Sequence, residues 1–371
     1  MNSIGLIGCG KLGICYATLF AKVGFKVYCY EINKTIIEAL VNDDYNYKEP
    51  NLNELIKANK SNLIICSNIK EVIENASIIF TFIQTPSLDN GSYNHAYIDE
   101  FINHCIQLGK KEERKTIVIS STVMPEYSSG LLEKIKDYNY DVTYNPSFIS
   151  QGSIIANIIN PDIILIGNDN NNYEDLIEIH KKVIENPNIK FKLMKLKEAE
   201  ITKIAINCYI TMKISYANLI GDFAKSVDCN EDIILDAIGN DSRIGNKYLK
   251  YGYGFGGPCL PRDNRALYYY FNKSNKNQNI NLNLCNITDD NNRNHLLFQY
   301  EELKKSIEPI EFKYITYKDS SDILEESQKL KLALLLAENG NEVIIYERSE
   351  IINQLKDKYQ KLNFININPI S

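Results

Sequence analysis

One cysteine in a glycine-rich turn has the setting in this chain that most strongly suggests chemistry. Cys259 follows the run Gly254-Phe255-Gly256-Gly257-Pro258 and stands four residues before Asp263. Glycines let a backbone approach a ligand closely, and a nearby carboxylate can orient water or a proton donor at the sulfur. A buried structural cysteine beside a turn is the alternative, because such thiols usually behave as small core residues. The glycines, the proline and the acid together favour a cysteine nucleophile.

Two polar residues in an apolar helical run are a second candidate. Lys203 and Asn207 are four residues apart in a helical pattern over 195–226, so they share one helix face. A snorkelling lysine beside a surface asparagine is the competing interpretation. In a dry site, however, the ammonium and the amide could each lower a barrier by about 3 kcal/mol through stabilisation of developing negative charge. Because the pattern is apolar on nearly every face, we expect this helix between domains or in a subunit interface.

A glycine-rich turn near the N-terminus predicts a dinucleotide site. Gly8, Gly10 and Gly13 follow the apolar run at 4–7 and open a helical pattern, and Glu31 ends the next apolar run. The first glycine makes a tight turn, the second lets a pyrophosphate approach the backbone, and the third lets the helix pack on the strand. Glu31 can accept both ribose hydroxyls of NAD, and its charge would repel the 2′-phosphate of NADP. The other candidate cofactor residues are Lys11, Leu12 and, unless it is only a solvated surface residue, Lys34.

Alternating apolar runs and helical patterns predict an α/β fold with a Rossmann-like, doubly wound sheet. The apolar runs are continuous, which is typical of parallel strands covered on both faces. They lie at 4–7, 26–30, 63–66, 77–83, 116–120, 141–144 and 163–166. Two of them end in polar turns that contain Thr85 and Thr122, where ligands bind in such sheets, although these turns could also be ordinary loops.

The C-terminal third predicts a smaller α/β unit. An asparagine-rich segment at 272–294, of which 280–294 could be helical, precedes a strand at 311–317, a helix at 326–339 and a strand at 342–346. We therefore expect three domains. They are an NAD-binding Rossmann domain at 1–190, a central helical dimerisation and catalytic region at 191–295, and an abbreviated C-terminal nucleotide-sugar-binding domain at 296–371.

Composition excludes several classes of function. The 371 residues are 44% hydrophobic and carry a net charge of -6, which argues against nucleic-acid or anionic-membrane partners. The nine cysteines lack metal-ligand spacing, so we expect no metal site and a reducing compartment. With no signal-like start and no apolar stretch of membrane-spanning length, we expect a cytoplasmic protein.

The segment from Arg243 to Asp263 resembles the active-site signature of the UDP-glucose/GDP-mannose dehydrogenase family. It reads Arg243-Ile244-Gly245-Asn246-Lys247-Tyr248-Leu249-Lys250 and continues through Cys259 to Asp263. Members oxidise the C6 alcohol of a nucleotide-sugar to a carboxylate with two NAD molecules, through a cysteine thiohemiacetal and thioester. The resemblance thus implies an NAD-dependent 6-dehydrogenase that acts on UDP-glucose or a close relative.

The resemblance also implies roles for particular residues. Cys259 would be the nucleophile, Lys203 and Asn207 would stabilise the oxyanion, and Asp263 and Thr122 would assist the hydrolytic water. Lys203 could also be the base of the first oxidation. Thr85 would lie near the cofactor, and Thr122 also near the nicotinamide. The residues implied to bind substrate are Phe148, Ile149, Lys203, Asn207, Arg243, Tyr248, Leu249, Lys250, Gly256 and Lys318.

A shared site is implied as well, because Arg243 resembles an arginine that is supplied to the substrate of the neighbouring subunit. We therefore expect a homodimer formed through the central helix. Plain solvated charges remain the alternative for Arg243 and Lys250.

Three departures from the family pattern bear on function. Ser147 and Gln151 stand where the family has glutamates, and the first of these belongs to the water network for thioester hydrolysis. Glu325 replaces an arginine that helps to bind phosphate or cofactor, and the chain ends at Ser371, before the usual last strands. Two alternatives follow. The enzyme could stop after a two-electron step with impaired hydrolysis, or the chain could be a degenerate NAD- or nucleotide-binding partner subunit.

Overall fold

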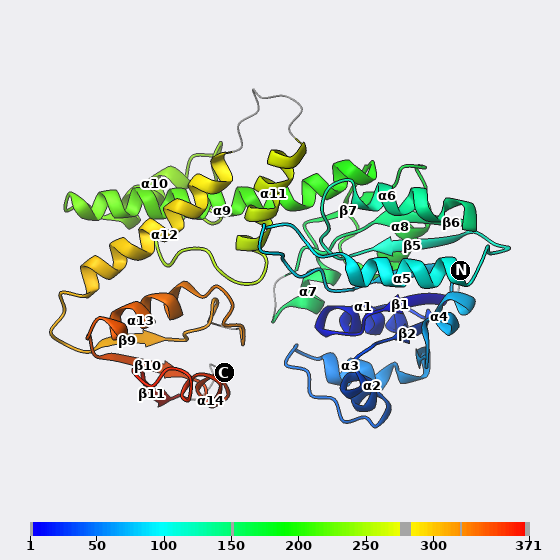
Figure 1. The fold of residues 1–371 in the computed structure, drawn as a ribbon, viewed down its shortest axis with the longest axis horizontal. Coiled ribbons are helices and arrows are strands. Elements are labelled where there is room, and N and C mark those ends of the chain that lie inside the picture. Colours follow the sequence, from blue (N-terminus) through cyan, green and yellow to red (C-terminus); the bar gives the residue numbers. More distant parts are fainter. Residues whose placement is uncertain (1–2, 150–151, 275–282, 320, 368–371) are drawn as a thin grey trace. The chain divides into compact units, whose positions relative to one another are not determined.

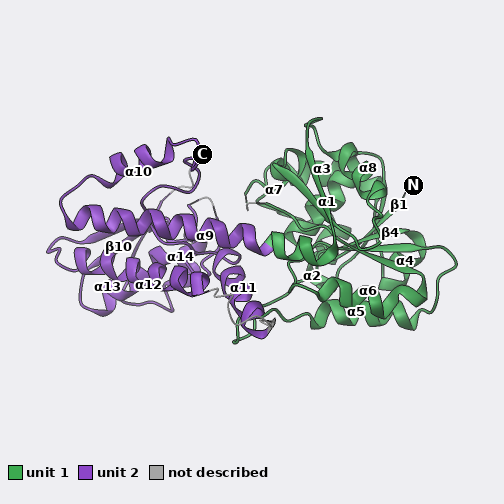
Figure 2. Cartoon of the chain, turned by 90° about the horizontal axis from the view of Figure 1, so that it is seen from above, with its two compact units in different colours: residues 1–203 green, residues 204–371 purple. Residues whose placement is uncertain are grey.

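The computed structural model describes residues 3–149, 152–274, 283–319 and 321–367. Gln151 and the first residues of the possible helix at 280–294 lie outside these ranges. The chain divides into two compact units, residues 1–203 and residues 204–371 (Figure 2).

The first unit is built on an eight-stranded sheet in the order β3-β2-β1-β4-β5-β6-β7-β8 (Figure 1). Its strands are β1 (Ser3–Ile7), β2 (Lys26–Tyr30), β3 (Leu63–Ile65), β4 (Ile78–Thr81), β5 (Lys115–Ile119), β6 (Tyr140–Tyr144), β7 (Ile163–Gly167) and β8 (Lys190–Met194). Neighbours from β3 to β6 are parallel, whereas β7 pairs antiparallel with β6, and β8 is parallel to β7. The doubly wound α/β fold is thereby confirmed, with seven strands at the predicted apolar runs.

Eight α-helices flank this sheet in the described part of the first unit. They are α1 (Lys11–Lys22), α2 (Lys34–Val41), α3 (Leu52–Ala58), α4 (Ile69–Asn75), α5 (Ala96–Gln107), α6 (Tyr127–Ile135), α7 (Ile154–Ile159) and α8 (Glu174–Val183). Successive strand residues point to opposite faces, so Phe80 joins the apolar cluster under α1, α3, α7 and α8, whereas Ile79 joins that under α4, α5 and α6. Helices therefore cover both faces of the sheet. A ligand site on this sheet is accordingly expected at the polar turns that follow the strands.

The second unit combines helices with a small parallel sheet. Its helices are α9 (Leu196–Ser226), which begins in the first unit, α10 (Glu231–Gly239), α11 (Leu260–Ser274), α12 (Asn283–Leu303), α13 (Gln328–Glu338) and α14 (Ser349–Leu355). The strands β9 (Ile310–Lys313), β10 (Val343–Glu347) and β11 (Asn363–Asn366) form a sheet in the order β11-β10-β9. The predicted long helix and the small βαβ unit are both present, and α12 begins in the asparagine-rich segment and continues beyond its end at residue 294.

Helix α9 exposes a row of aromatic side chains. Tyr209, Tyr216 and Phe223 are 58%, 47% and 64% exposed. Their spacing of seven residues places them on one helix face, since seven residues make nearly two full turns. Large aromatic side chains are usually buried, so this exposed row is an unusual feature of the helix surface.

No helix in the described ranges combines the length and low polarity that crossing a membrane requires.

Candidate active site

The glycine turn between β1 and α1 has the geometry that its sequence predicted. Gly8 adopts a φ of 93°, and a Cβ atom there would lie 2.6 Å from the carbonyl oxygen of Phe82. A Cβ atom on Gly13 would overlap the carbonyl oxygen of Gly8. Gly10 precedes the helix in an ordinary extended conformation, and a Cβ atom there would meet nothing within 4 Å. Packing therefore requires the outer two glycines, whereas the middle one faces open space in which a pyrophosphate would fit.

Glu31 holds this turn at the end of β2. Its Oε2 accepts the backbone N–H of Cys9 at 2.7 Å, and its Oε1 accepts that of Asn33 at 2.9 Å. A carboxylate has further lone pairs, so it can still accept hydroxyl groups. Of the remaining cofactor candidates, Lys11 and Lys34 are exposed and Leu12 is half-buried.

A pair of glycine substitutions should separate packing from cofactor contact. We expect Gly13→Ala to lower the melting temperature by more than 5 °C and to abolish dinucleotide binding, because its Cβ would displace the backbone of Gly8. Gly10→Ala should leave the melting temperature within about 2 °C and still weaken NAD binding at least tenfold, since the added methyl enters the open space. Thermal unfolding and calorimetric titration with NAD measure the two effects. Equal melting temperatures for both variants would contradict the packing argument.

The turns after β4 and β5 are joined to each other. Thr85 is buried and donates its hydroxyl to the carbonyl oxygen of Thr122 at 2.8 Å. Ser121 donates to the carbonyl oxygen of Ile83. Thr122 itself is half-buried. The two predicted threonines therefore meet at the carboxyl ends of neighbouring strands, the edge at which such sheets bind ligands.

Lys203 reaches the loop after β6. Its ammonium donates to the carbonyl oxygen of Ser147 at 2.8 Å and lies 4.4 Å from the ring centre of Phe148. The Ser147 hydroxyl donates to the hydroxyl oxygen of Tyr16 at 2.9 Å, and burial raises the pKa of Tyr16 to about 12. Ile149 is half-buried against the core on the α1 side of the sheet. Where the family resemblance implied a carboxylate, the loop thus carries a neutral serine–tyrosine pair.

A buried histidine that the sequence did not single out holds the start of this loop. His180 is 2% exposed, and its Nε2 donates to the Oδ1 of Asn145 at 2.8 Å, while the Asn145 amide donates to the carbonyl oxygen of Leu165. Burial lowers the pKa of His180 to about 4. The neutral imidazole therefore anchors Asn145, two residues before Ser147.

The first unit should become less stable in acid because of His180. Its pKa falls from 6.5 to about 4 on folding, so its contribution is complete above pH 6.5 and is lost between pH 6.5 and 4, by about 3 kcal/mol. Glu200 has the opposite slope, because burial raises its pKa to about 7. We therefore expect the difference in melting temperature between wild type and His180→Gln to shrink as the pH falls. The exposed His104, replaced in the same way, is the control; a difference that does not depend on pH would contradict this assignment.

Asn207, Cys259 and Asp263 come together in the second unit. The Asn207 amide on α9 donates to the Oδ2 of Asp263 on α11 at 2.6 Å. The backbone N–H of Asp263 donates to the carbonyl oxygen of Cys259 at 3.0 Å, so the cysteine directly precedes the first turn of α11. Asp263 is only 2% exposed, whereas the thiol-bearing Cys259 is exposed. Lys203, Thr85 and Thr122 belong to the first unit.

The predicted substrate residues after α10 have mixed environments. Arg243 is exposed and pairs with Asp241 at 2.7 Å, and Tyr248 is exposed at a φ of 63°. Leu249 is buried and packs against Ala217 and Leu235. Lys250 and Lys318 are exposed. In this group Leu249 therefore has a core position, whereas the charged residues remain accessible.

Comparisons with known proteins agree with this arrangement. Residues 2–207 match the NAD binding domain of the UDP-glucose/GDP-mannose dehydrogenase family, and residues 197–294 match its central domain. The first match identifies NAD as the cofactor of the first unit. The chain is 30% identical over 275 residues to UDP-glucose 6-dehydrogenase TuaD of Bacillus subtilis, covering 72% of this chain and 58% of that protein. It is 26% identical to UDP-glucose 6-dehydrogenase AglM of Haloferax volcanii, covering 93% of this chain and 83% of AglM.

Solved structures give the same result for the fold. A UDP-glucose dehydrogenase from Pyrobaculum islandicum superimposes with a TM-score of 0.87 at 25% identity, covering 100% of this chain and 87% of that one. A UDP-D-ManNAc dehydrogenase from Pyrococcus horikoshii, at 19% identity, shares the fold with a TM-score of 0.78 over 93% of this chain and 83% of that one. The relatives thus differ in the nucleotide-sugar that they are named for. With the family models matched across the glycine turn, the long helix and the cysteine loop, this chain belongs to the UDP-glucose/GDP-mannose dehydrogenase family.

Proposed function

We propose that this protein oxidises the C6 alcohol of a nucleotide-sugar, UDP-glucose or a close relative, to the carboxylate with two equivalents of NAD. The observation that carries the proposal is the contact of Asn207 with Asp263 beside the exposed Cys259. Together these residues provide a thiol and a carboxylate at the start of α11 and an amide donor on α9, which contacts the carboxylate. Membership of the UDP-glucose/GDP-mannose dehydrogenase family supports the proposal that these groups act on the C6 alcohol of a nucleotide-sugar.

The first oxidation converts the alcohol to an aldehyde. Lys203, as the neutral amine, takes the hydroxyl proton, and NAD bound to the first unit would supply the hydride acceptor. The Nζ atom of Lys203 is held by the carbonyl oxygen of Ser147 and the ring of Phe148, so its position is set before substrate binds. A general base held within reach of the proton contributes about 10²–10⁴-fold to such a step.

The second oxidation passes through covalent chemistry at sulfur. The Cys259 thiol adds to the aldehyde carbon, its proton passes to the oxygen, and a thiohemiacetal results. The thiohemiacetal then loses its hydroxyl proton to water and a second hydride, for which a second NAD would be the acceptor, and a thioester results. Asn207 and Lys203 donate to the oxyanion that forms on addition. Water, oriented by Asp263 and Thr122, then cleaves the thioester and releases the carboxylate together with the thiol.

The residues of the first unit fit NAD. The open space above Gly10 admits the pyrophosphate, the helix that follows offers its N-terminus, and Glu31 stands beside the turn with oxygens that can accept ribose hydroxyls. Thr85 and Thr122 lie at the strand ends where the nicotinamide would be held. Lys11, Leu12 and Lys34 complete the proposed cofactor side.

The neutral pair of Ser147 and Tyr16 favours a second candidate with the same fold. A serine cannot act as a carboxylate base, and the raised pKa of Tyr16 keeps its phenol protonated at neutral pH. Hydrolysis would then depend on Asp263 and Thr122 alone. If the thioester is not hydrolysed, the enzyme can turn over only when the aldehyde leaves after the first hydride transfer, before Cys259 adds to it.

Counting reduced cofactor distinguishes these outcomes. The purified protein is mixed with NAD and, separately, UDP-glucose, UDP-N-acetylmannosamine and GDP-mannose, and NADH is measured per sugar consumed. Two equivalents support the proposed four-electron oxidation, and one supports the two-electron alternative. Binding of NAD and nucleotide-sugar without any NADH would refute both and leave the partner-subunit interpretation.

We further propose that two copies of the chain associate through the exposed face of α9. Tyr209, Tyr216 and Phe223 form an apolar row along that face, which a second copy of the same helix would cover. The proposal accounts for Arg243, whose exposed guanidinium could then reach the substrate of the neighbouring subunit.

Charge placed in the aromatic row should dissociate the dimer. We expect Phe223→Glu to sediment as a monomer at concentrations where the wild type sediments as a dimer, since an unpaired carboxylate would be buried. Ile307 is 97% exposed outside this row, and Ile307→Glu should leave the mass unchanged. A wild-type protein that is monomeric, or a dimeric Phe223 variant, would rule out this interface.

A further inference from the structure

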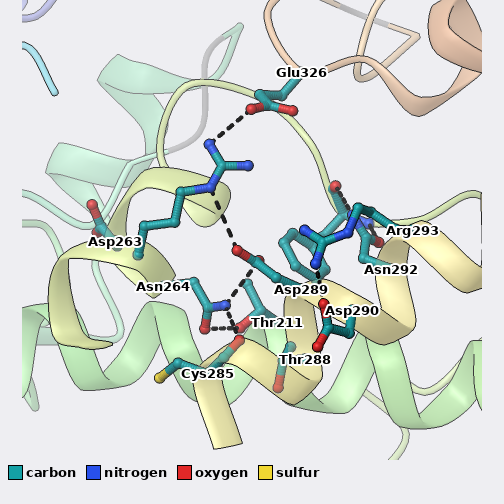
Figure 3. A network of polar contacts seen from close by, with 12 residues as sticks. Thr211, Asp263, Asn264, Cys285, Thr288, Asp289, Asp290, Asn292, Arg293 and Glu326 are labelled. Carbon is teal, nitrogen blue, oxygen red and sulfur yellow. Dashed lines mark hydrogen bonds and ion pairs between the residues drawn. The ribbon is translucent and has the colours of Figure 1, made fainter. Parts of the chain in front are cut away.

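The loop that carries Cys259 is held at both ends by α12. After the loop, the Asn264 amide donates to the carbonyl oxygen of Cys285 at 2.7 Å and to the Oδ1 of Asp289 at 2.9 Å (Figure 3). Asn264 is 1% exposed, so these bonds fix the first turn of α11 within the unit. Asp263, by contrast, points away from this network (Figure 3).

Before the loop, Asn292 forms two hydrogen bonds with the main chain of a single residue. Its Oδ1 accepts the N–H of Phe255 at 2.9 Å, and its amide donates to the carbonyl oxygen of Phe255 at 3.0 Å. Phe255 is 3% exposed and Asn292 is 9% exposed. Buried main-chain groups need partners, and here one side chain satisfies a donor and an acceptor together. Because Asn292 is three residues after Asp289, both anchors lie on one face of α12.

The glycines of the loop are required by protein contacts. A Cβ atom on Gly254 would overlap the Oδ1 of Asn292, and one on Gly256 would overlap the carbonyl oxygen of Glu326. Gly257 adopts a φ of 79°, and a Cβ atom there would lie 2.6 Å from the Tyr317 ring. The N–H of Gly257 also donates to the carbonyl oxygen of Glu325 at 3.1 Å. The loop is therefore packed between α12 and the residues Tyr317, Glu325 and Glu326, and Cys259 follows two residues after Gly257.

We propose that Asn292 is a positioning residue for the Cys259 thiol. This inference rests on the proposed function, because it assigns to Asn292 the task of holding the nucleophile in line with the aldehyde carbon. The two hydrogen bonds of Asn292, here called the clamp, fix Phe255, which lies four residues before the cysteine. The hydrogen bonds of Asn264 fix the chain five residues after the cysteine. Loss of the two Asn292 bonds leaves the Gly257 bond to Glu325 to hold this side of the cysteine, so the thiol moves while α11 stays in place. A displacement of about 1 Å in a reacting group can cost about 10²-fold in rate.

Two substitutions and one matched control test this role. Asn292→Ala removes both bonds, and we expect kcat to fall about 30-fold while the KM for the nucleotide-sugar changes less than threefold. Asn292→Asp keeps the acceptor for the Phe255 N–H but places a carboxylate oxygen against the Phe255 carbonyl. Protonation restores a donor, so the activity of this variant relative to wild type should rise at least fivefold from pH 8.5 to pH 6. Asn294→Ala, exposed on the same helix, should behave as wild type.

A second measurement does not depend on catalysis. Iodoacetamide is added to the protein without ligands, and the labelling of Cys259 is followed by mass spectrometry of its peptide. The cysteine stands at the N-terminus of α11, which favours the thiolate. Release of the loop should therefore slow labelling at pH 7.5 about fivefold in both Asn292 variants. If one of the two variants does not fold, the other still provides the measurement.

The outcomes separate this inference from the proposed function. If wild type makes no NADH but the Asn292 variants label slowly, the proposed function fails and the clamp on the thiol stands. If the Asn292 variants match Asn294→Ala in both labelling and kcat, or if only KM rises, the positioning role is wrong. The positioning role would also be wrong if the activity of Asn292→Asp relative to wild type did not change with pH.

Discussion

Replacement of Cys259 by serine is expected to abolish the second oxidation. A serine hydroxyl is a far weaker nucleophile than a thiol, because almost none of it is ionised at neutral pH. We expect uronate formation to fall at least about 10³-fold, which is the scale on which removing a covalent nucleophile acts. NADH should not exceed one equivalent per sugar, and an aldehyde-trapping hydrazine should capture the product.

A matched control tests whether the effect is specific. Cys229 is also exposed, in the turn after α9, and Cys229→Ser should keep full activity. If Cys259→Ser still yields two equivalents of NADH at the wild-type rate, covalent catalysis at this thiol is excluded.

Replacement of Asp263 by asparagine should instead trap the covalent intermediate. The variant keeps an oxygen that can accept the Asn207 amide, so the contact between α9 and α11 survives. It loses the carboxylate that orients water, and we expect thioester hydrolysis to slow by about 10²–10⁴-fold. NADH should appear in a burst of about two equivalents per active site and then nearly stop. Intact-protein mass spectrometry should show one uronyl nucleotide attached through Cys259.

The exposed Asp228 supplies the control for charge. Its positive φ suits asparagine equally well, so Asp228→Asn should fold and turn over as wild type. A variant of Asp263 that loses the burst itself would assign the carboxylate to hydride transfer or binding, and one with steady wild-type turnover would remove it from the mechanism.

The first unit was largely predictable because its strands are apolar throughout. Continuous runs such as Ile78–Thr81 need no knowledge of partners, since both faces of the sheet are covered. Strand β8 was missed because Lys190 and Lys192 interrupt its apolar residues at the edge of the sheet. The reversed direction of β7 was equally invisible, because an apolar run carries no information about the direction of its neighbour.

Candidate residues were predictable where a motif fixes them locally. The glycine turn and Glu31 have partners within the turn or in an adjacent strand, and the cysteine loop was found by its residue types alone. His180 and Asn292 escaped notice because their partners are 35 and 37 residues away. A single polar residue in a helical pattern does not reveal its role from the sequence, because its hydrogen-bond partner is known only once the chain has folded.

The sequence also attributed the loop glycines to the approach of a ligand. In the structure, Gly254, Gly256 and Gly257 are crowded by other parts of the chain. Contacts with distant residues are therefore a reason for these glycines that the local sequence does not reveal, whereas the approach of a ligand stays a prediction.

The continuity of α9 has a consequence for how this chain can vary. Lys203 ends the first unit and Asn207 lies in the second, with uninterrupted helix between them. One inserted or deleted residue in that stretch would rotate the asparagine about 100° around the axis relative to the lysine. Deep mutational scanning should therefore find that the partly exposed positions 205 and 206 accept many exchanges of side chain, but that no insertion or deletion is tolerated between residues 203 and 207.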